Sequence, residues 1–177
     1  MARWATFRNW MRSSAGEVPD EFGRVAVTIT TLRPEHVTAF EALNREWLVA
    51  HELLEPADEP HLTDPEGRII AAGGQVFVAL EDETVIGTCG VVPTHAGEFE
   101  VVKLAVASSA RGRGIGRQLV SACLAHARQL GARRVVLISN SRLVSALRLY
   151  ERVGFRYAPL PADNPYATGD VCMVMEL

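Results

Sequence analysis

A glycine-rich loop in the middle of the chain has the residue types and spacing to hold a phosphate. The loop reads Arg111, Gly112, Arg113, Gly114, Ile115, Gly116. Its alternate glycines allow tight turns and a close approach to a ligand, because they carry no Cβ atom. A predicted helix over 116–130 follows, and its first amides would point outward, where the helix dipole adds roughly half a positive charge. The loop therefore predicts a site for phosphate or pyrophosphate.

Basic side chains are concentrated around this loop. Residues 101–150 contain no Asp or Glu, and their basic residues are Lys103, Arg111, Arg113, Arg117, Arg128, Arg133, Arg134, Arg142 and Arg148. The chain has a formal charge of −3, so the rest of it carries −12. This split favours a polyanionic ligand. The alternative for single residues such as Arg128 and Arg148 is a solvated position on a helix face.

The spacing differs from that of two common phosphate loops. A dinucleotide fingerprint needs G-x-G-x-x-G and an acid about 20 residues later, whereas this loop is G-x-G-x-G and 134–138 holds no acid. A Walker loop needs Gly-Lys-Ser/Thr, which the loop lacks. The loop instead resembles the R-x-x-G-x-G/A signature of the GNAT superfamily of acyl-CoA N-acyltransferases.

Two flanking segments extend this resemblance. Residues 100–106 (EVVKLAV) look like the fourth strand of that family, and 146–155 (ALRLYERVGF) are similar to its A-x-x-L-Y-E-x-x-G-F ending. The resemblance implies an α/β fold, α+β by some schemes. It consists of a mixed central sheet of about seven strands flanked by about four helices. The co-substrate would be acetyl-CoA, with no metal.

The resemblance also implies how acetyl-CoA would bind. Amides of the loop would hold the pyrophosphate, Arg111 would brace the loop, and Arg113 and Arg117 would reach the pyrophosphate or the 3′-phosphate. Arg142 could do so from the next helix or be solvated.

A bulge would part the fourth and fifth strands, and the pantetheine arm would then pair with the backbone of Leu104, Ala105 and Val106. The Val106 amide would face the oxyanion. Asn140 would bond a pantetheine amide, with helix N-capping as an equal alternative, because Leu143 stands where the family more often has Asn.

Two catalytic residues follow from the same resemblance. Glu100 matches the position of a catalytic glutamate, which would need a pKa raised by burial to act as a base near neutral pH. The alternative is that Glu100 is a solvated or paired strand residue and that water relays the proton. Tyr150 matches the general acid that protonates the CoA thiolate, or else only packs against the sheet. Glu98 is a weaker candidate base and more typical of a turn.

The predicted reaction is acetyl transfer from acetyl-CoA to a primary amine of a small molecule or peptide by direct attack. The alternative is a CoA-binding module of the same fold without turnover. A nucleic-acid binder is disfavoured, because the chain is acidic overall and has no aromatic residue among the arginines of 101–148. The resemblance implies that the first two helices, their linker and the loop between the last two strands shape the acceptor pocket. These acceptor segments hold many acids, which would form either a negative rim for a cationic amine or an ordinary acidic surface: Glu46, Glu52, Glu55, Asp58, Glu59, Asp64 and Glu66.

Composition limits the remaining classes. The 177 residues are 48% hydrophobic and 22% charged, which is typical of a globular protein. No apolar run approaches the roughly 20 residues of a membrane span. The three cysteines have no metal spacing, so we expect reduced thiols in a cytoplasmic protein. Lys103 is the single lysine among the eighteen Lys and Arg residues. This preference for arginine is a compositional bias and does not bear on mechanism. The sequence leaves the oligomeric state open, with a homodimer as one option, since GNAT proteins are often dimers.

Periodicity predicts the order of elements that would position these residues. Residues 1–24 form an extension, either a short docking helix or disordered, and 25–177 form one GNAT domain. Helices are predicted over 34–50, from 64 to about 73, and over 116–130 and 141–152. Strands are predicted over 25–32, 75–80, 85–92, 99–106, 133–139, 155–159 and 171–177. The resulting order is β-α-α-β-β-β-α-β-α-β-β, that of the GNAT fold.

Overall fold

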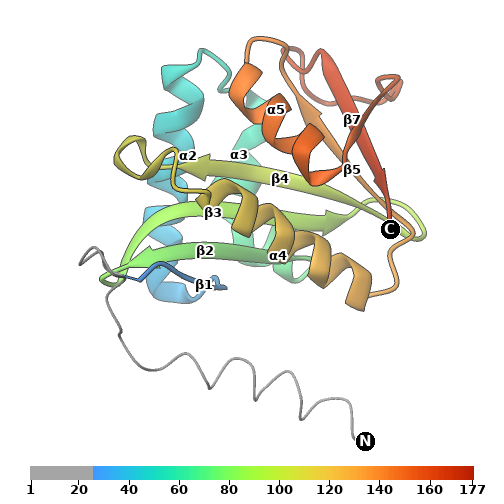
Figure 1. Ribbon diagram of the computed structural model, residues 1–177. Coiled ribbons are helices and arrows are strands. Elements are labelled where there is room, and N and C mark those ends of the chain that lie inside the picture. Colours follow the sequence, from blue (N-terminus) through green and yellow to red (C-terminus); the bar gives the residue numbers. More distant parts are fainter. Residues whose placement is uncertain (1–25) are drawn as a thin grey trace, which may run out of the picture.

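A mixed sheet of seven strands is the centre of the molecule. The structure is a computed structural model, and it describes residues 26–177. The strands lie in the order β1-β2-β3-β4-β5-β7-β6 (Figure 1). Their bounds are β1 Thr28–Thr31, β2 Gln75–Glu81, β3 Thr84–Pro93, β4 Glu98–Val106, β5 Arg134–Ser139, β6 Arg156–Ala158 and β7 Val171–Glu176. Neighbouring strands run antiparallel except β4 and β5, which are parallel.

Four α-helices and several short turns connect these strands. The helices are α2 Val37–Ala50, α3 Glu59–Thr63, α4 Ile115–Gln129 and α5 Val144–Val153. Helices α4 and α5 pack on one face of the sheet, and α2 with the turn at 66–70 covers the other (Figure 1). Both faces are therefore buried, which explains the apolar runs in the central strands.

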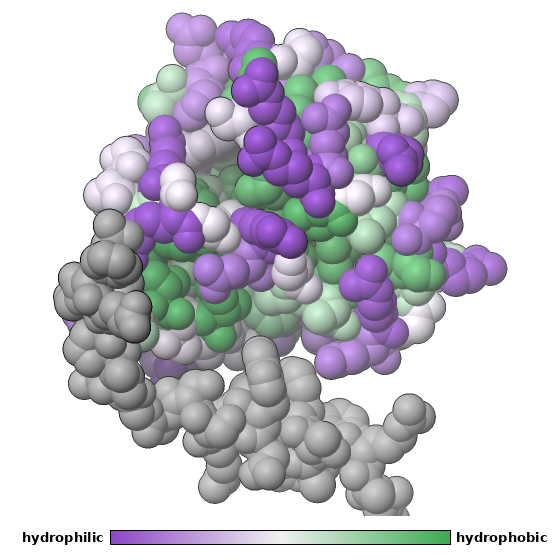
Figure 2. Space-filling view, viewed as in Figure 1, coloured by the Kyte–Doolittle hydropathy of each residue, from purple (hydrophilic) through white to green (hydrophobic). Residues whose placement is uncertain are grey.

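Each face of the sheet has its own apolar core. The core under α4 and α5 includes Leu119, Val120 and Phe155, and the core under α2 includes Phe40 and Ile69. On the outside, hydrophilic side chains border hydrophobic surface on the face that carries α4 and α5 (Figure 2).

The predicted order of elements is confirmed by the observed order. The prediction was wrong in one segment, where a helix was expected from 64 to about 73. A 3₁₀ turn at Pro56–Asp58 leads directly into α3, and Glu66–Ile70 form a π-helical turn. Pro56 and Pro60 begin helical turns here, because proline suits the first turn of a helix. The extension predicted for residues 1–24 lies outside the described residues.

A bulge in β4 interrupts its pairing with β3. Thr88 pairs with Ala105 and Gly90 with Val102, so two residues of β4, Lys103 and Leu104, lie opposite one residue of β3. Lys103 has φ +53°, a left-handed conformation that is uncommon outside glycine. Side chains on the two sides of the bulge therefore no longer alternate as in a regular strand.

A buried chain of hydrogen bonds holds this bulge. The Asn44 side-chain amide of α2 donates to the carbonyl of Phe40 (2.9 Å) and to Thr88 Oγ1 (2.9 Å). The Thr88 hydroxyl donates in turn to the carbonyl of Lys103 (3.0 Å). Asn44 and Thr88 are 2% and 0% exposed, so water cannot replace these bonds.

Thr88→Val should lower the free energy of unfolding by about 1–3 kcal/mol, because it leaves a buried donor and a buried acceptor unsatisfied. Thr84→Val, at the exposed start of the same strand, is the matched control and should change stability by less than about 0.5 kcal/mol. Urea unfolding of the two variants and the wild type measures the difference. Equal stability of all three would mean that the hydrogen-bond chain does not support the bulge.

Candidate active site

The glycine loop forms one end of a surface groove of about 690 Å³. Gly114 precedes α4 with φ +77°, and Gly112 has the same φ. A Cβ atom on either glycine would meet no protein atom within 4 Å, so the space beside them is open to a ligand. The first turn of α4 contains no acidic residue, and its amides have no partners within the helix. The arrangement has the geometry and the dipole that suit an anion at a helix N-terminus.

The arginines of the loop differ in position. Arg111 and Arg117 line the groove, and Arg111 Nε donates to the carbonyl of Val106 (3.3 Å), which braces the loop against β4. Arg113 is not among the residues that line the groove, and its guanidinium pairs with Glu81 of β2 (2.5 and 3.2 Å). Arg113 therefore anchors the loop, and any contact with a phosphate remains a prediction.

Parting of two strands opens the groove toward the middle of the sheet. Strands β4 and β5 pair only from Glu98 to Glu100 and from Arg134 to Val136. Beyond this point β4 has no strand partner on that side among residues 26–177. Leu104 and Val106 line the groove, while Ala105 is 1% exposed. The backbone of 104–106 is thus placed to pair with an extended ligand.

A second cavity of about 130 Å³ adjoins the groove. The two share a boundary of four residues: Trp47, Leu104, Leu143 and Ala146. Glu100 and Tyr150, the predicted base and acid, both line this cavity, as does Asn140. The predicted base and acid and the glycine loop therefore lie along two adjoining hollows.

Glu100 is partly buried at the wall of the cavity. Burial raises its pKa to about 7, while Lys103 opposes and Glu98 adds to the increase. A carboxylate with this pKa can accept a proton near neutral pH. Tyr166, from the loop between β6 and β7, also lines the cavity, and burial followed by the charge of Glu100 raises the pKa of its phenol.

The carboxylate of Glu98 is engaged in hydrogen bonds within the protein. It accepts hydrogen bonds from Thr94 Oγ1 (2.7 Å), His95 Nδ1 (3.1 Å) and Arg134 Nε (2.5 Å). Burial raises the pKa of Glu98, but these three donors outweigh it and hold the pKa below its ordinary value. Glu98 begins β4 and ties it to β5, so it is a structural residue rather than a base.

Tyr150 of α5 is 7% exposed and packs edge-on against Phe155. Burial raises the pKa of its phenol, and the neighbouring thiols of Cys89 and Cys123 add to the increase. The phenol is therefore protonated at neutral pH, as a general acid must be before it donates.

Asn140 is 8% exposed, and the protein uses both ends of its amide. Nδ2 donates to the carbonyl of Thr168 (2.6 Å), and Oδ1 accepts from the Arg142 backbone amide (2.9 Å). Asn140 thus joins β5 to the 159–170 loop and caps the turn before α5. A contact with pantetheine remains a prediction.

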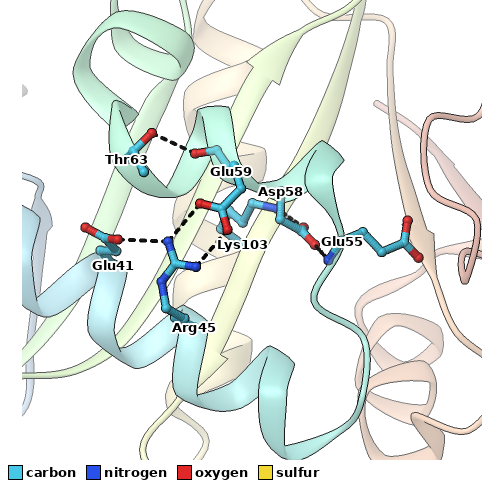
Figure 3. Close-up of polar contacts among 7 residues, drawn as sticks. All are labelled: Glu41, Arg45, Glu55, Asp58, Glu59, Thr63 and Lys103. Carbon is cyan, nitrogen blue, oxygen red and sulfur yellow. Dashed lines mark hydrogen bonds and ion pairs between the residues drawn. The ribbon is translucent and has the colours of Figure 1, made fainter.

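Most acidic side chains of the acceptor segments are paired. Glu55 accepts from the amides of Ala167 (2.8 Å) and Thr168 (2.6 Å), Glu59 from Arg45 (2.8 and 2.9 Å), and Asp64 from Gly67 (2.8 Å). Asp58 forms a buried ion pair with Lys103 (Figure 3). These carboxylates hold the fold together, so they do not form a free negative rim.

Sequence reasoning missed the role of Lys103. Its side chain is 5% exposed, lines the cavity and lies 5.5 Å from the centre of the Tyr166 ring. The one signal was that a chain rich in arginine has a single lysine, in the strand beside the glycine loop. Partners 45 and 63 residues away, Asp58 and Tyr166, could not be recognised without the fold.

The seven-stranded sheet, the glycine loop before α4 and the parting of β4 from β5 are the features expected of the acyl-CoA N-acyltransferase fold. A family model described as the Acetyltransferase (GNAT) family matches residues 37–155, more than half of the chain. The chain therefore belongs to the GNAT acetyltransferase family. The resemblance inferred from the loop and its flanks is confirmed.

Several curated proteins are similar in sequence. An uncharacterised N-acetyltransferase of Bacillus subtilis, YvbK, is 28% identical over 105 residues, which is 58% of this chain and 68% of that protein. N-acetyltransferase 8B of Homo sapiens is 34% identical over 89 residues, 48% of this chain and 39% of that one. A mycothiol acetyltransferase of Geodermatophilus obscurus is 45% identical over 92 residues, 52% and 29% of the two chains. The chain thus spans well under half of the last two proteins.

Solved structures share the fold. A GNAT-family acetyltransferase of Staphylococcus aureus superposes with a TM-score of 0.79 at 19% identity, covering 86% of this chain and 99% of that one. PaiA N-acetyltransferase of Thermoplasma acidophilum, solved in complex with coenzyme A, gives 0.68 at 16% identity, with 86% and 99% covered. At these identities the likeness shows the fold, and the predicted α/β GNAT fold is confirmed.

None of the helices within residues 26–177 combines the length and apolar character needed to cross a bilayer.

Glu100→Gln should remove a pH-dependent cost to stability. A buried carboxyl with a raised pKa favours folding while it is protonated, and this contribution is lost as pH rises from about 4.5 through about 7. The difference between these pKa values corresponds to roughly 3 kcal/mol. Relative to wild type, Glu100→Gln should therefore gain about 3 kcal/mol between pH 4.5 and pH 8. Urea unfolding across this range, with exposed Glu176→Gln as control, measures it; parallel curves for wild type and Glu100→Gln would contradict the raised pKa.

Proposed function

We propose that this protein is an N-acetyltransferase that transfers acetyl from acetyl-CoA to a primary amine by direct attack, with residues 25–177 as its catalytic domain. The observation that carries the proposal is the meeting of the loop groove with a cavity that holds Glu100 and Tyr150. Family membership supports the reaction class, and the relatives named N-acetyltransferases agree with it.

The groove suits the shape of coenzyme A. The amides and glycines of 112–116 would hold the pyrophosphate, and Arg111 and Arg117 add positive charge at the same end. The backbone of Leu104 to Val106 would pair with the pantetheine arm, which carries the thioester toward the second cavity. The amide of Val106 would stabilise the negative charge that develops on the carbonyl oxygen.

The reaction then needs three proton transfers. The acceptor enters as an ammonium and loses a proton to Glu100, directly or through water, since its ordinary pKa keeps it protonated at pH 7. The neutral nitrogen forms the N–C bond to the acetyl carbon, and the C–S bond breaks. The departing thiolate takes the proton of the Tyr150 phenol. The acetylated nitrogen still carries one proton too many, and it passes this proton, directly or through water, to the Tyr150 phenolate, which restores the phenol. The products are the acetylated amine and CoA.

Tyr150→Phe and Glu100→Gln should each lower kcat by about 10²- to 10⁴-fold, because each removes a proton-transfer group. Exposed Tyr157→Phe is the control and should keep full activity. Release of free thiol from acetyl-CoA, measured with a panel of amines, amino acids, polyamines, aminoglycosides and peptides, gives the rates. Wild-type kcat/KM should also fall as pH drops below about 7, because burial raises the pKa of Glu100 to about 7.

A protein without turnover on any acceptor that still binds acetyl-CoA would instead be a CoA-binding module. Full activity of Tyr150→Phe would remove Tyr150 from the mechanism.

Gly114→Ala should weaken acetyl-CoA binding by at least about tenfold, because a Cβ atom enters the phosphate side of the loop. Gly131→Ala is a close control: Gly131 has φ +79°, against +77° for Gly114, and neither Cβ would meet protein within 4 Å. The two variants share the conformational cost of alanine in a left-handed conformation, about 1–2 kcal/mol. Calorimetric titration separates them, and equal affinities would place the phosphate elsewhere.

A further inference from the structure

The second cavity contains a buried cation that the reaction itself does not require. Lys103 is held in its left-handed conformation by the bulge, which turns its side chain to the layer of α2 and α3. In a regular strand, Lys103 would follow Val101 into the core under α4. A buried lysine in a strained conformation is costly, so it is expected where it has a function.

The Lys103 ammonium has hydrogen-bonding capacity to spare. It has three N–H donors, and among residues 26–177 its hydrogen-bond partner is Asp58 Oδ1. The other oxygen of Asp58 accepts from the Glu55 amide (2.9 Å). Asp58 therefore neutralises Lys103 and accepts one hydrogen bond at each of its oxygens, while the ammonium can still donate to an oxygen in the cavity.

Glu100 supplies the opposite charge in the same cavity. It precedes Lys103 by three residues on β4, and both side chains line the space. Because Lys103 and Asp58 compensate each other, the cavity offers one carboxylate for a substrate ammonium and one ammonium for a substrate anion. A second cationic group on the acceptor could not accept a hydrogen bond from the Lys103 ammonium, because both groups are donors only.

The size of the cavity limits how far apart the two substrate groups can be. Its volume is about 130 Å³, and Trp47, Leu53 and Tyr166 are among its walls. The loop of 159–170 is tied down over it by Glu55, which accepts from two of its amides, and by Asn140, which bonds Thr168. The acceptor portion in this space is therefore small.

We propose that the acceptor is a small amino acid, with its amine at Glu100 and its carboxylate on Lys103. This inference rests on the proposed N-acetyltransferase activity and names the class of its acceptor. Lys103 is then the residue that selects amino acids over simple amines.

The test compares amino acids with the amines that lack only the carboxylate: glycine with methylamine, alanine with ethylamine and serine with ethanolamine. Glycinamide and alaninamide stand for peptide N-termini. In the thiol-release assay, wild type should prefer each amino acid in kcat/KM by about 10- to 100-fold, the range for one charge-assisted hydrogen bond.

Lys103 is tested by the pair of substitutions Lys103→Met and Asp58→Asn made together, since Lys103→Met alone would leave a buried carboxylate unpaired. This double variant should reduce the preference to about 1. The control replaces the neighbouring pair, Arg45→Met with Glu59→Gln, which does not line the cavity (Figure 3). The control should keep the wild-type preference.

Distinct outcomes would overturn the two proposals. Equal or better turnover of the simple amines or the amides would overturn the amino-acid class while leaving acetyl transfer intact. A double variant that keeps the preference would exclude Lys103. No turnover on any acceptor would overturn the activity. In that case, calorimetric titration of the three amino acids into the protein–CoA complex decides the acceptor site, and absence of binding would overturn it as well.

Discussion

The bulge at Lys103 in β4 is the feature on which both halves of the site depend. Without it, β4 would continue in register with β3, and Lys103 would point to the opposite face of the sheet. The buried bonds from Asn44 to Thr88 and from Thr88 to the Lys103 carbonyl hold the strained backbone in place. Because β5 leaves β4 after Glu100, the backbone beyond the bulge is free to bind a ligand. The bulge thus aims a cation into the cavity, and the parting of β5 from β4 exposes backbone to the groove.

Charge is distributed so that the two parts of the site differ. The groove is bordered by arginines and by the N-terminus of α4, and no acidic residue occurs between 101 and 150. The cavity instead holds a compensated pair, Lys103 with Asp58, beside a carboxylate whose pKa is raised by burial. A polyanionic donor therefore suits the groove, and proton transfer suits the cavity. Tyr150 and Glu100 have little access to solvent. This favours proton transfer in the cavity, since charges interact more strongly where water is excluded.

The acidic residues of the acceptor segments show how position changes the meaning of a residue. In the sequence, Glu55, Asp58 and Glu59 belong to an acidic, proline-rich stretch that is typical of a solvent-exposed loop. In the fold, Glu55 fastens the 159–170 loop, Asp58 neutralises Lys103, and Glu59 holds Arg45 of α2. Of these three carboxylates, Asp58 lines the cavity. All three charges are paired within the protein, so none of them is evidence for a negative rim around the acceptor.

Local patterns in the sequence determined much of this protein. Apolar periodicity predicted the order of helices and strands, and the glycine loop with its flanks predicted the family, because these signals lie within short segments. The glycine loop, Leu104, Val106, Glu100 and Tyr150 lie along the two adjoining hollows. The tertiary structure alone decided the features that depend on distant partners. These are the left-handed backbone of Lys103, its ion pair with Asp58, the position of Tyr166 in the cavity wall, and the ion pair of Arg113 with Glu81. Each of these features arises from contacts between residues far apart in the chain, and no local sequence pattern encodes which distant side chain will pair with a given charge.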